Sequence, residues 1–145
     1  MDAVAVKKLK ENAILPTYGS SEAAGADLYA CLETDVTIQP GQTAFIPTGL
    51  AMEIPCGCAG LIYARSGLAC KRGLAPANKV GVVDSDYRGE FMIALHNHGD
   101  IPQTVCHGER VAQLLITPVF TPGFMVVQEL SDTQRAAGGF GSTGK

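Results

Sequence analysis

Short runs in which apolar and polar residues alternate cover most of the chain, the pattern of β-strands that bury one face. Residues 34–38, 43–47 and 50–54 show it most clearly. Gly, Pro and Asn separate such runs at intervals of about ten residues, which predicts an all-β sandwich, jelly roll or small barrel. The other predicted strands are 4–9, 26–30, 60–64, 90–96, 103–106, 111–117 and 124–127, with a hairpin of 74–76 and 79–83 around Ala77-Asn78.

Two segments depart from the strand pattern. Residues 65–73 predict one helix of about two turns, which Gly73 ends and for which Ser66 could serve as N-cap. After Leu130 the apolar pattern stops, and the rest is small, polar and rich in glycine. We therefore expect a β domain over 1–130 and a mobile C-terminal arm over 131–145.

Composition restricts the class of protein. At 145 residues, with 46% apolar and 17% charged residues, the chain fits one globular domain. A net charge of −3 without a basic stripe argues against nucleic-acid binding, and no apolar run approaches the ~20 residues of a membrane span. The N-terminus resembles no signal peptide, and five cysteines at non-motif spacings are expected to be reduced. These features predict a protein of the cytoplasm, or of the nucleus in a eukaryotic or viral system, that is not secreted.

The stretch 81–90, GVVDSDYRGE, contains the most informative chemistry. Asp84 directly follows an apolar, β-branched run, so its carboxylate is placed at the end of a rigid strand. Asp84 and Asp86 are two residues apart, and on an extended chain they would point the same way. The stretch is equally compatible with a polar turn between two strands.

Three other positions suggest anion or metal chemistry. Arg65 and Ser66 open the predicted helix, where unpaired N–H groups attract a phosphate; an arginine would oppose the dipole if the position were only a cap. Asp27 at the start of a strand could bind a metal or orient a water, although an exposed loop carboxylate would also explain it. Gln113 lies in an apolar strand, so its amide is either satisfied in the core or directed into a cleft.

The arm carries an isolated aromatic residue. Phe140 lies among glycines, close to Arg135, and could stack on a planar ring. Residues 139–145 match a phosphate-binding loop formally, but no strand precedes them and no helix follows, so the match is not a Walker loop. Successive glycine N–H groups can still curl around phosphate. Together these features predict a phosphorylated ligand with a ring, and a nucleotide fits.

Five blocks, in order and over nearly the whole chain, resemble the motifs of the trimeric deoxyuridine triphosphate nucleotidohydrolases (dUTPases). The blocks are AGADL at 24–28, RSG at 65–67, 81–89, GERVAQ at 108–113 and 135–144. The resemblance implies a jelly-roll-like (β-clip) subunit in a homotrimer, with active sites at subunit interfaces. It also implies hydrolysis of dUTP to dUMP and pyrophosphate with Mg²⁺, which limits uracil incorporation into DNA and supplies dUMP for thymidylate synthesis.

The resemblance also implies roles for single residues. Asp84 would be the general base that activates a water for attack on the α-phosphorus, and Asp27 would contact Mg²⁺ through water, the metal being held mainly by the triphosphate. Tyr87 would pack under the deoxyribose and exclude a 2′-hydroxyl. Uracil would be bound by Asn78 and by neighbouring backbone, including Gly81 and Val83. The triphosphate would be lined by Arg65, Ser66, Gly67 and Gln113, and the closing arm would contribute Arg135, Phe140, Gly141 and Ser142.

Two alternatives remain at this point. A dCTP deaminase shares the fold, but it needs a proton shuttle near the base, and we find no second carboxylate placed there. A non-catalytic nucleotide-binding trimer would have kept the scaffold without Asp84, Tyr87 or the arm, all of which are present. Ala64 stands where many dUTPases have proline, and Arg88 and Glu90 could simply pair with each other.

Overall fold

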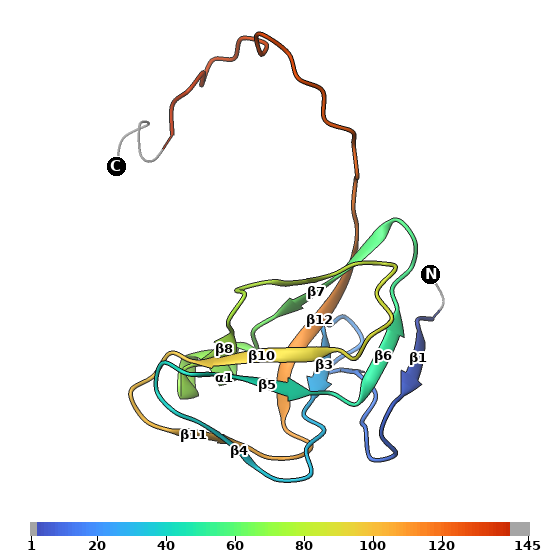
Figure 1. Cartoon of the computed structure of the whole chain (residues 1–145), viewed down its shortest axis with the longest axis vertical. Coiled ribbons are helices and arrows are strands. Elements are labelled where there is room, and N and C mark those ends of the chain that lie inside the picture. Colours follow the sequence, from blue (N-terminus) through green and yellow to red (C-terminus); the bar gives the residue numbers. More distant parts are fainter. Residues whose placement is uncertain (1–2, 140–145) are drawn as a thin grey trace.

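The computed structural model describes residues 3–139 and contains one short helix among short strands (Figure 1). The early strands are β1 (Ala5–Lys8), β2 (Thr17–Tyr18), β3 (Ala26–Tyr29), β4 (Val36–Ile38), β5 (Thr43–Pro47), β6 (Leu50–Glu53) and β7 (Cys58–Tyr63). They are followed by helix α1 (Ser66–Arg72), β8 (Leu74–Pro76), β9 (Gly81–Val83), β10 (Met92–Asn97), β11 (Gln103–Val105) and β12 (Arg110–Pro118). The predicted all-β class is confirmed. No helix within residues 3–139 is long and apolar enough to cross a bilayer.

The strands form small antiparallel sheets that surround one core. The largest sheet within the described residues has the order β2-β3-β12-β7-β9, and a second has the order β5-β10-β8. Two further pairs, β1-β6 and β11-β4, complete the jelly-roll-like body. Alternating residues of the strands fill most of the core, and its large buried side chains include Leu28, Ile38, Ile46, Leu50, Leu74, Phe91, Ile93 and Leu95.

The buried polar side chains of the body are hydrogen-bonded. Asn97 is fully buried and donates to the carbonyl oxygens of Ile38 (2.9 Å) and Ile101 (2.8 Å) while its own oxygen accepts from the Gly99 amide. Thr48 is also fully buried and donates to the Phe91 carbonyl oxygen at 2.7 Å. Because unpaired buried polar groups cost free energy, these bonds fix where the turns meet the core.

The predicted helix is present, but its N-cap lies one residue earlier than predicted. Arg65, with extended backbone, is the N-cap of α1, and it makes no side-chain capping bond. Ser66 is therefore the first helical residue, and its predicted capping role is wrong. Gly73 ends the helix in the left-handed conformation (φ 65°), as predicted. A Cβ there would lie 2.8 Å from the Gly99 amide nitrogen, so only glycine fits.

Three local predictions are wrong. Strands β8 and β9 do not pair with each other: β8 pairs with β10 and β9 with β7, because each finds a longer partner elsewhere in the body. Asp86 lies in a turn beyond β9, so its orientation relative to Asp84 does not follow strand alternation. Arg88 pairs with Glu53 (3.6 Å) and not with Glu90.

The chain leaves the body after β12, as the long orange-to-red segment in Figure 1 shows. The strand predicted at 124–127 is absent, because nothing in the single chain pairs with it. Apolar side chains of this segment are almost fully exposed, among them Phe120 (97%), Phe124 (101%) and Val126 (100%). Such a run of exposed apolar residues is typical of segments that take part in contacts with another surface.

Candidate active site: a cleft and an arginine cluster

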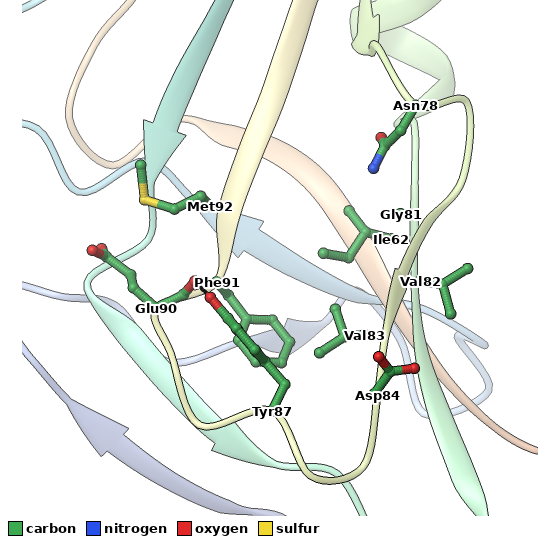
Figure 2. Close-up of a pocket in the computed structure, with 10 residues that line it drawn as sticks. All are labelled: Ile62, Asn78, Gly81, Val82, Val83, Asp84, Tyr87, Glu90, Phe91 and Met92. Atoms are coloured by element: carbon green, nitrogen blue, oxygen red, sulfur yellow. Dashed lines mark hydrogen bonds between the residues drawn. The ribbon is translucent and has the colours of Figure 1, made fainter.

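A cleft of about 210 Å³ opens where β9 leads into the 84–90 loop (Figure 2). Its lining includes the predicted residues Asn78, Gly81, Val83, Asp84 and Tyr87. The structure therefore brings together the candidates for base recognition, sugar recognition and general base catalysis. We call this set the Asp84 cleft.

Strand β9 and the turn that follows it explain the shape of the cleft. β9 pairs with β7 through Gly81–Ile62 and Val83–Gly60, which fixes the last strand residue before Asp84. The Asp84 carbonyl oxygen then accepts from the Tyr87 amide (3.2 Å), and this turn directs the chain back toward β10. Asp84 is exposed and, within residues 3–139, its side chain makes no ion pair or hydrogen bond. A free carboxylate at the mouth of a cleft is available to accept a proton from water.

Gly81 keeps the floor of the cleft open. A Cβ on Gly81 would lie 3.1 Å from the Asn78 side-chain nitrogen and 3.2 Å from Ile62 Cβ. Glycine here leaves the backbone of β9 accessible beside Asn78, as main-chain recognition of a flat base requires. Val82 also lines the cleft, and its side chain is 64% exposed, so this wall of the cleft is open to solvent.

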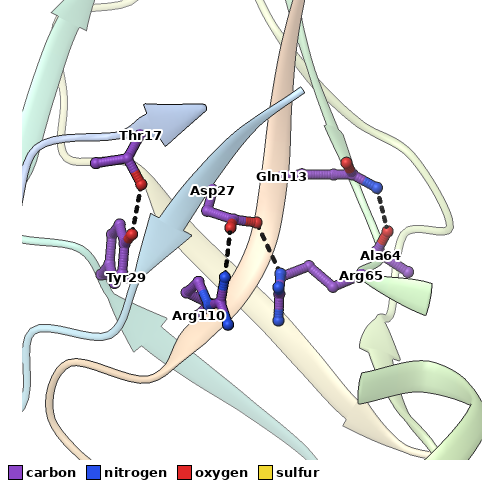
Figure 3. A network of polar contacts seen from close by, with 7 residues as sticks. All are labelled: Thr17, Asp27, Tyr29, Ala64, Arg65, Arg110 and Gln113. Carbon is purple, nitrogen blue, oxygen red and sulfur yellow. Dashed lines mark hydrogen bonds and ion pairs between the residues drawn. The ribbon is translucent and has the colours of Figure 1, made fainter. Parts of the chain in front are cut away.

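A second group of predicted residues lies on the same sheet but elsewhere (Figure 3). The Asp27 carboxylate accepts from Arg65 Nε at 2.7 Å and from Arg110 Nη1 at 3.2 Å, and its side chain is only 14% exposed. Gln113 lies opposite Asp27 in the β3–β12 register and donates to the Ala64 carbonyl oxygen (2.8 Å). We call Asp27, Arg65, Arg110 and Gln113 the Asp27 cluster.

Gly25 and Gly67 complete the surroundings of this cluster. A Cβ on Gly25 would lie 2.7 Å from Gln113 Oε1, so glycine allows the amide to lie against the strand. No atom lies within 4 Å of a Cβ built on Gly67, and the backbone there does not require glycine. Together with Ser66, Gly67 leaves the beginning of α1 uncrowded beside Arg65, where a phosphate group could approach the first amides.

The sequence had not assigned a role to Arg110. A bulge in β12 between Arg110 and Ala112 shifts the register against β3, and the Arg110 guanidinium bonds the Asp27 oxygen that Arg65 leaves free. From the sequence alone, only the position of Arg110, three residues before Gln113 in the same strand, could have suggested this role. Its partner could not be identified, because Asp27 and Arg110 are 83 residues apart.

The residues of the Asp27 cluster do not form a resident metal site. Within residues 3–139 no three His, Cys, Asp or Glu side chains gather in a way that could hold an ion. Both oxygens of Asp27 already accept from guanidinium groups, so direct coordination would displace an arginine. The donor set fits a metal that the ligand's phosphates bring with them, since Mg²⁺ keeps several waters and takes phosphate oxygens readily.

The Asp84 cleft and the Asp27 cluster lie toward opposite ends of β7. Asp84 follows Val83, which is paired with Gly60 near the start of β7. Tyr63 at the end of β7 is paired with Gln113, and Arg65 lies two residues further on. The five residue steps from Gly60 to Arg65 span roughly 16 Å at about 3.3 Å per residue. One chain therefore does not bring the predicted base and the predicted phosphate ligands to one point.

The arm residues lie apart from both groups. Arg135 is exposed, and its Nε donates to the Gly138 carbonyl oxygen within a local turn (2.9 Å). The predicted contacts of Phe140, Gly141 and Ser142 fall outside the described residues.

The family model for dUTPase matches residues 11–144. The chain belongs to the dUTPase family. It is 53% identical over 131 residues to the deoxyuridine 5′-triphosphate nucleotidohydrolase of Desulfitobacterium hafniense, covering 90% of this chain and 87% of the relative. It is 47% identical to the protein of the same name from Syntrophotalea carbinolica, covering 97% and 96%.

A solved structure from this family has the same fold. The Staphylococcus bacteriophage 80alpha dUTPase with dUpNHpp superposes with a TM-score of 0.92 at 29% identity, and the match covers 100% of both chains. The family membership and the jelly-roll-like fold inferred from the five blocks are thus confirmed.

Proposed function

We propose that the chain hydrolyses dUTP to dUMP and pyrophosphate, with Asp84 as the general base. The observation that supports the assignment of the base is the unpaired Asp84 carboxylate at the end of β9, beside Tyr87 and Asn78. Asp84 accepts a proton from water as that water attacks the α-phosphorus. The bond from the α-phosphorus to the bridging oxygen of the β-phosphate breaks, and pyrophosphate leaves. The other proton of the water stays on dUMP or passes to solvent.

The remaining cleft residues select the nucleotide. Asn78 and the backbone near Gly81 and Val83 bind the uracil edge, and a base with a mismatched donor pattern would leave buried groups unpaired. Tyr87 packs under the deoxyribose. Its ring leaves no room for a 2′-hydroxyl, so UTP is rejected.

The Asp27 cluster supplies the positive charge. The guanidinium groups of Arg65 and Arg110 provide two positive charges, and Asp27 holds both groups in place until phosphate is present. Ser66, Gly67 and Gln113 add donors along the triphosphate. Because phosphoryl transfer depends mainly on positioning and charge neutralisation, this set performs most of the stabilisation. Mg²⁺ bound to the phosphates would withdraw charge from the reacting phosphorus, and Asp27 would contact it through water.

We propose that the chain acts as a homotrimer in which the Asp84 cleft of one copy faces the Asp27 cluster of another. The separation of the two groups along β7 supports this arrangement, because one chain alone offers only part of a site. The exposed apolar residues of the 119–130 segment support it too, since assembly would cover them. The arm, including Arg135 and the predicted residues Phe140, Gly141 and Ser142, would close over the nucleotide as a lid.

The deaminase alternative is not favoured. Glu90 is the other carboxylate that lines the cleft, but its Oε1 accepts from the Gly49 amide at 2.7 Å, so it is committed to the fold.

All five cysteines are free, which supports a reducing compartment such as the cytoplasm.

The test is pyrophosphate release from dUTP, dTTP, dCTP and UTP in parallel, with Mg²⁺. We expect release from dUTP only, and its loss in EDTA. Ammonia released from dCTP would identify a deaminase instead. A folded protein that binds dUTP and releases no product would identify a binding scaffold.

A further inference from the structure

The Tyr87 ring is held by the three residues that follow Arg88, and none of these was assigned a role. Tyr87 Oη donates to the Glu90 carbonyl oxygen at 3.0 Å, and the ring packs against Phe91 with centroids 6.2 Å apart. A Cβ on Gly89 would lie 2.3 Å from Tyr87 Oη and 2.5 Å from Cζ. The ring thus lies across Gly89, and only glycine leaves space for it there.

The side chain of Glu90 points in a different direction from its carbonyl group. Figure 2 shows its carboxylate extending away from Asp84, toward the side of the cleft where Met92 lies. There Oε1 accepts from the Gly49 amide at 2.7 Å, and within residues 3–139 the carboxylate forms no ion pair. Glu90 therefore joins Tyr87, through its backbone, to the turn at Gly49, through its side chain.

The turn at Gly49 is a rigid anchor. Gly49 has a left-handed backbone (φ 68°), and a Cβ there would lie 2.8 Å from Ala13 Cβ and 2.9 Å from Cys31 Sγ. Fully buried Thr48 donates to the Phe91 carbonyl oxygen (2.7 Å), and the Phe91 amide donates to the Leu50 carbonyl oxygen (2.8 Å). Residues on both sides of Gly49 are thus hydrogen-bonded to Phe91, which directly follows Glu90.

Cys31, beside this turn, lies close enough to the Glu90 carboxylate to be affected by its charge. Burial of the Cys31 thiol raises its pKa, and the nearby negative charge of Glu90 adds to the increase. Glu90 is half-buried beside this turn, while Arg88 lies at the surface with Glu53.

We propose that Glu90 is a positioning residue that sets the height of the Tyr87 ring and thereby the discrimination between deoxyribose and ribose, with Gly89 providing the space. This inference rests on the proposed function, in which Tyr87 lies under the sugar. A ring fixed at both its hydroxyl and its face cannot yield to a 2′-hydroxyl. A ring released by loss of the Glu90–Gly49 bond can tilt and admit one. Displacements of about 1 Å at such a site change rates strongly.

The test compares kcat/KM for dUTP and UTP in wild type, Glu90→Ala and Glu90→Gln. Glu90→Ala should lower the dUTP-to-UTP ratio by about tenfold, the order expected from one lost hydrogen bond and a tilted ring. Glu90→Gln keeps an acceptor oxygen at the same reach and should retain the wild-type ratio. If Glu90→Ala lowers activity on both nucleotides equally, the residue is merely structural and the proposal is overturned.

Two further variants separate positioning from folding. In a Tyr87→Ala background, Glu90→Ala should change the ratio no further, because it acts through the ring; an undiminished effect would overturn the proposal. Gly89→Ala leaves the Gly49 bond intact but pushes on the ring, so it should lower the ratio even if Glu90→Ala fails to fold. An unchanged ratio in Gly89→Ala would overturn it. Wild-type protein inactive on dUTP would instead refute the proposed function itself.

Discussion

The Asp84 cleft and the Asp27 cluster are opposites in how their polar groups are satisfied. Asp84 is exposed without a partner, whereas Asp27 is 14% exposed and bonded by two guanidinium groups. Gln113 likewise already donates to a backbone carbonyl. A proton acceptor must be free to act, while phosphate-binding cations need to be held in place without collapsing onto one another. This difference is the one that the proposed function requires of two complementary parts of a site.

The largest effect should come from the free carboxylate. Asp84→Asn preserves shape and removes the proton acceptor, so kcat for dUTP should fall by about 10²–10⁴-fold while KM changes little. Steady-state pyrophosphate release measures both. Asp86→Asn is the matched control, since it removes a carboxylate from the adjacent turn, and its kcat should stay near wild type. Equal losses in the two variants would contradict the assignment of the base.

The next experiment tests whether the two halves come from different copies. Asp84→Asn and Arg65→Ala proteins should each be nearly inactive, but trimers reassembled from an equal mixture should regain about a quarter of wild-type activity, because about one interface in four pairs two intact halves. Mixing without prior dissociation is the control and should restore nothing. Absence of recovery in verified mixed trimers would place both halves in the site of one copy.

A smaller loss should follow from releasing the two arginines. Asp27→Asn removes the charge that holds Arg65 and Arg110, and kcat/KM should fall roughly tenfold, as expected for a broken ion-pair network with partial burial. Raising the Mg²⁺ concentration should not restore activity if holding the arginines is the main role of Asp27. Recovery at high Mg²⁺ would favour the metal-contact role. The control is Tyr29→Phe on the same strand as Asp27, which removes a polar contact to Thr17 of β2 and should remain close to wild type.

The smallest effect should come from Gly67→Ala, which we expect to stabilise the fold but to weaken substrate binding. Gly67 is exposed in the first turn of α1 with no crowding, so Gly67→Ala should stabilise the fold by up to about 0.5–1 kcal/mol. The added methyl group would stand where phosphate approaches, so KM should rise. Thermal unfolding and steady-state kinetics measure the two effects. Cys70→Ala on the same helix should leave KM unchanged, and a parallel rise there would dismiss the phosphate interpretation.

Much of the candidate site could be predicted because its signals are local. Asp84 follows a β-branched run, and Gly81, Asn78 and Tyr87 lie close to it in sequence, so one cleft collects them. Arg65 and Gly67 are similarly identified by the start of the helix. The roles of Arg110, Gly49 and Glu90 were missed, because each depends on a partner between 41 and 83 residues away.

The sequence by itself determined the alternation of short strands, the single helix ended by Gly73, and the five blocks that identify the family. These are properties of residues next to one another, where backbone preference and side-chain period act directly. Only the tertiary structure decided that β9 pairs with β7, that β8 pairs with β10, and that Asp27 lies between two arginines. Strand pairing depends on which distant edges the packed core brings together, and no local pattern encodes that choice. The pairing of β9 with the start of β7 also places Asp84 far from Arg65, which follows the end of β7.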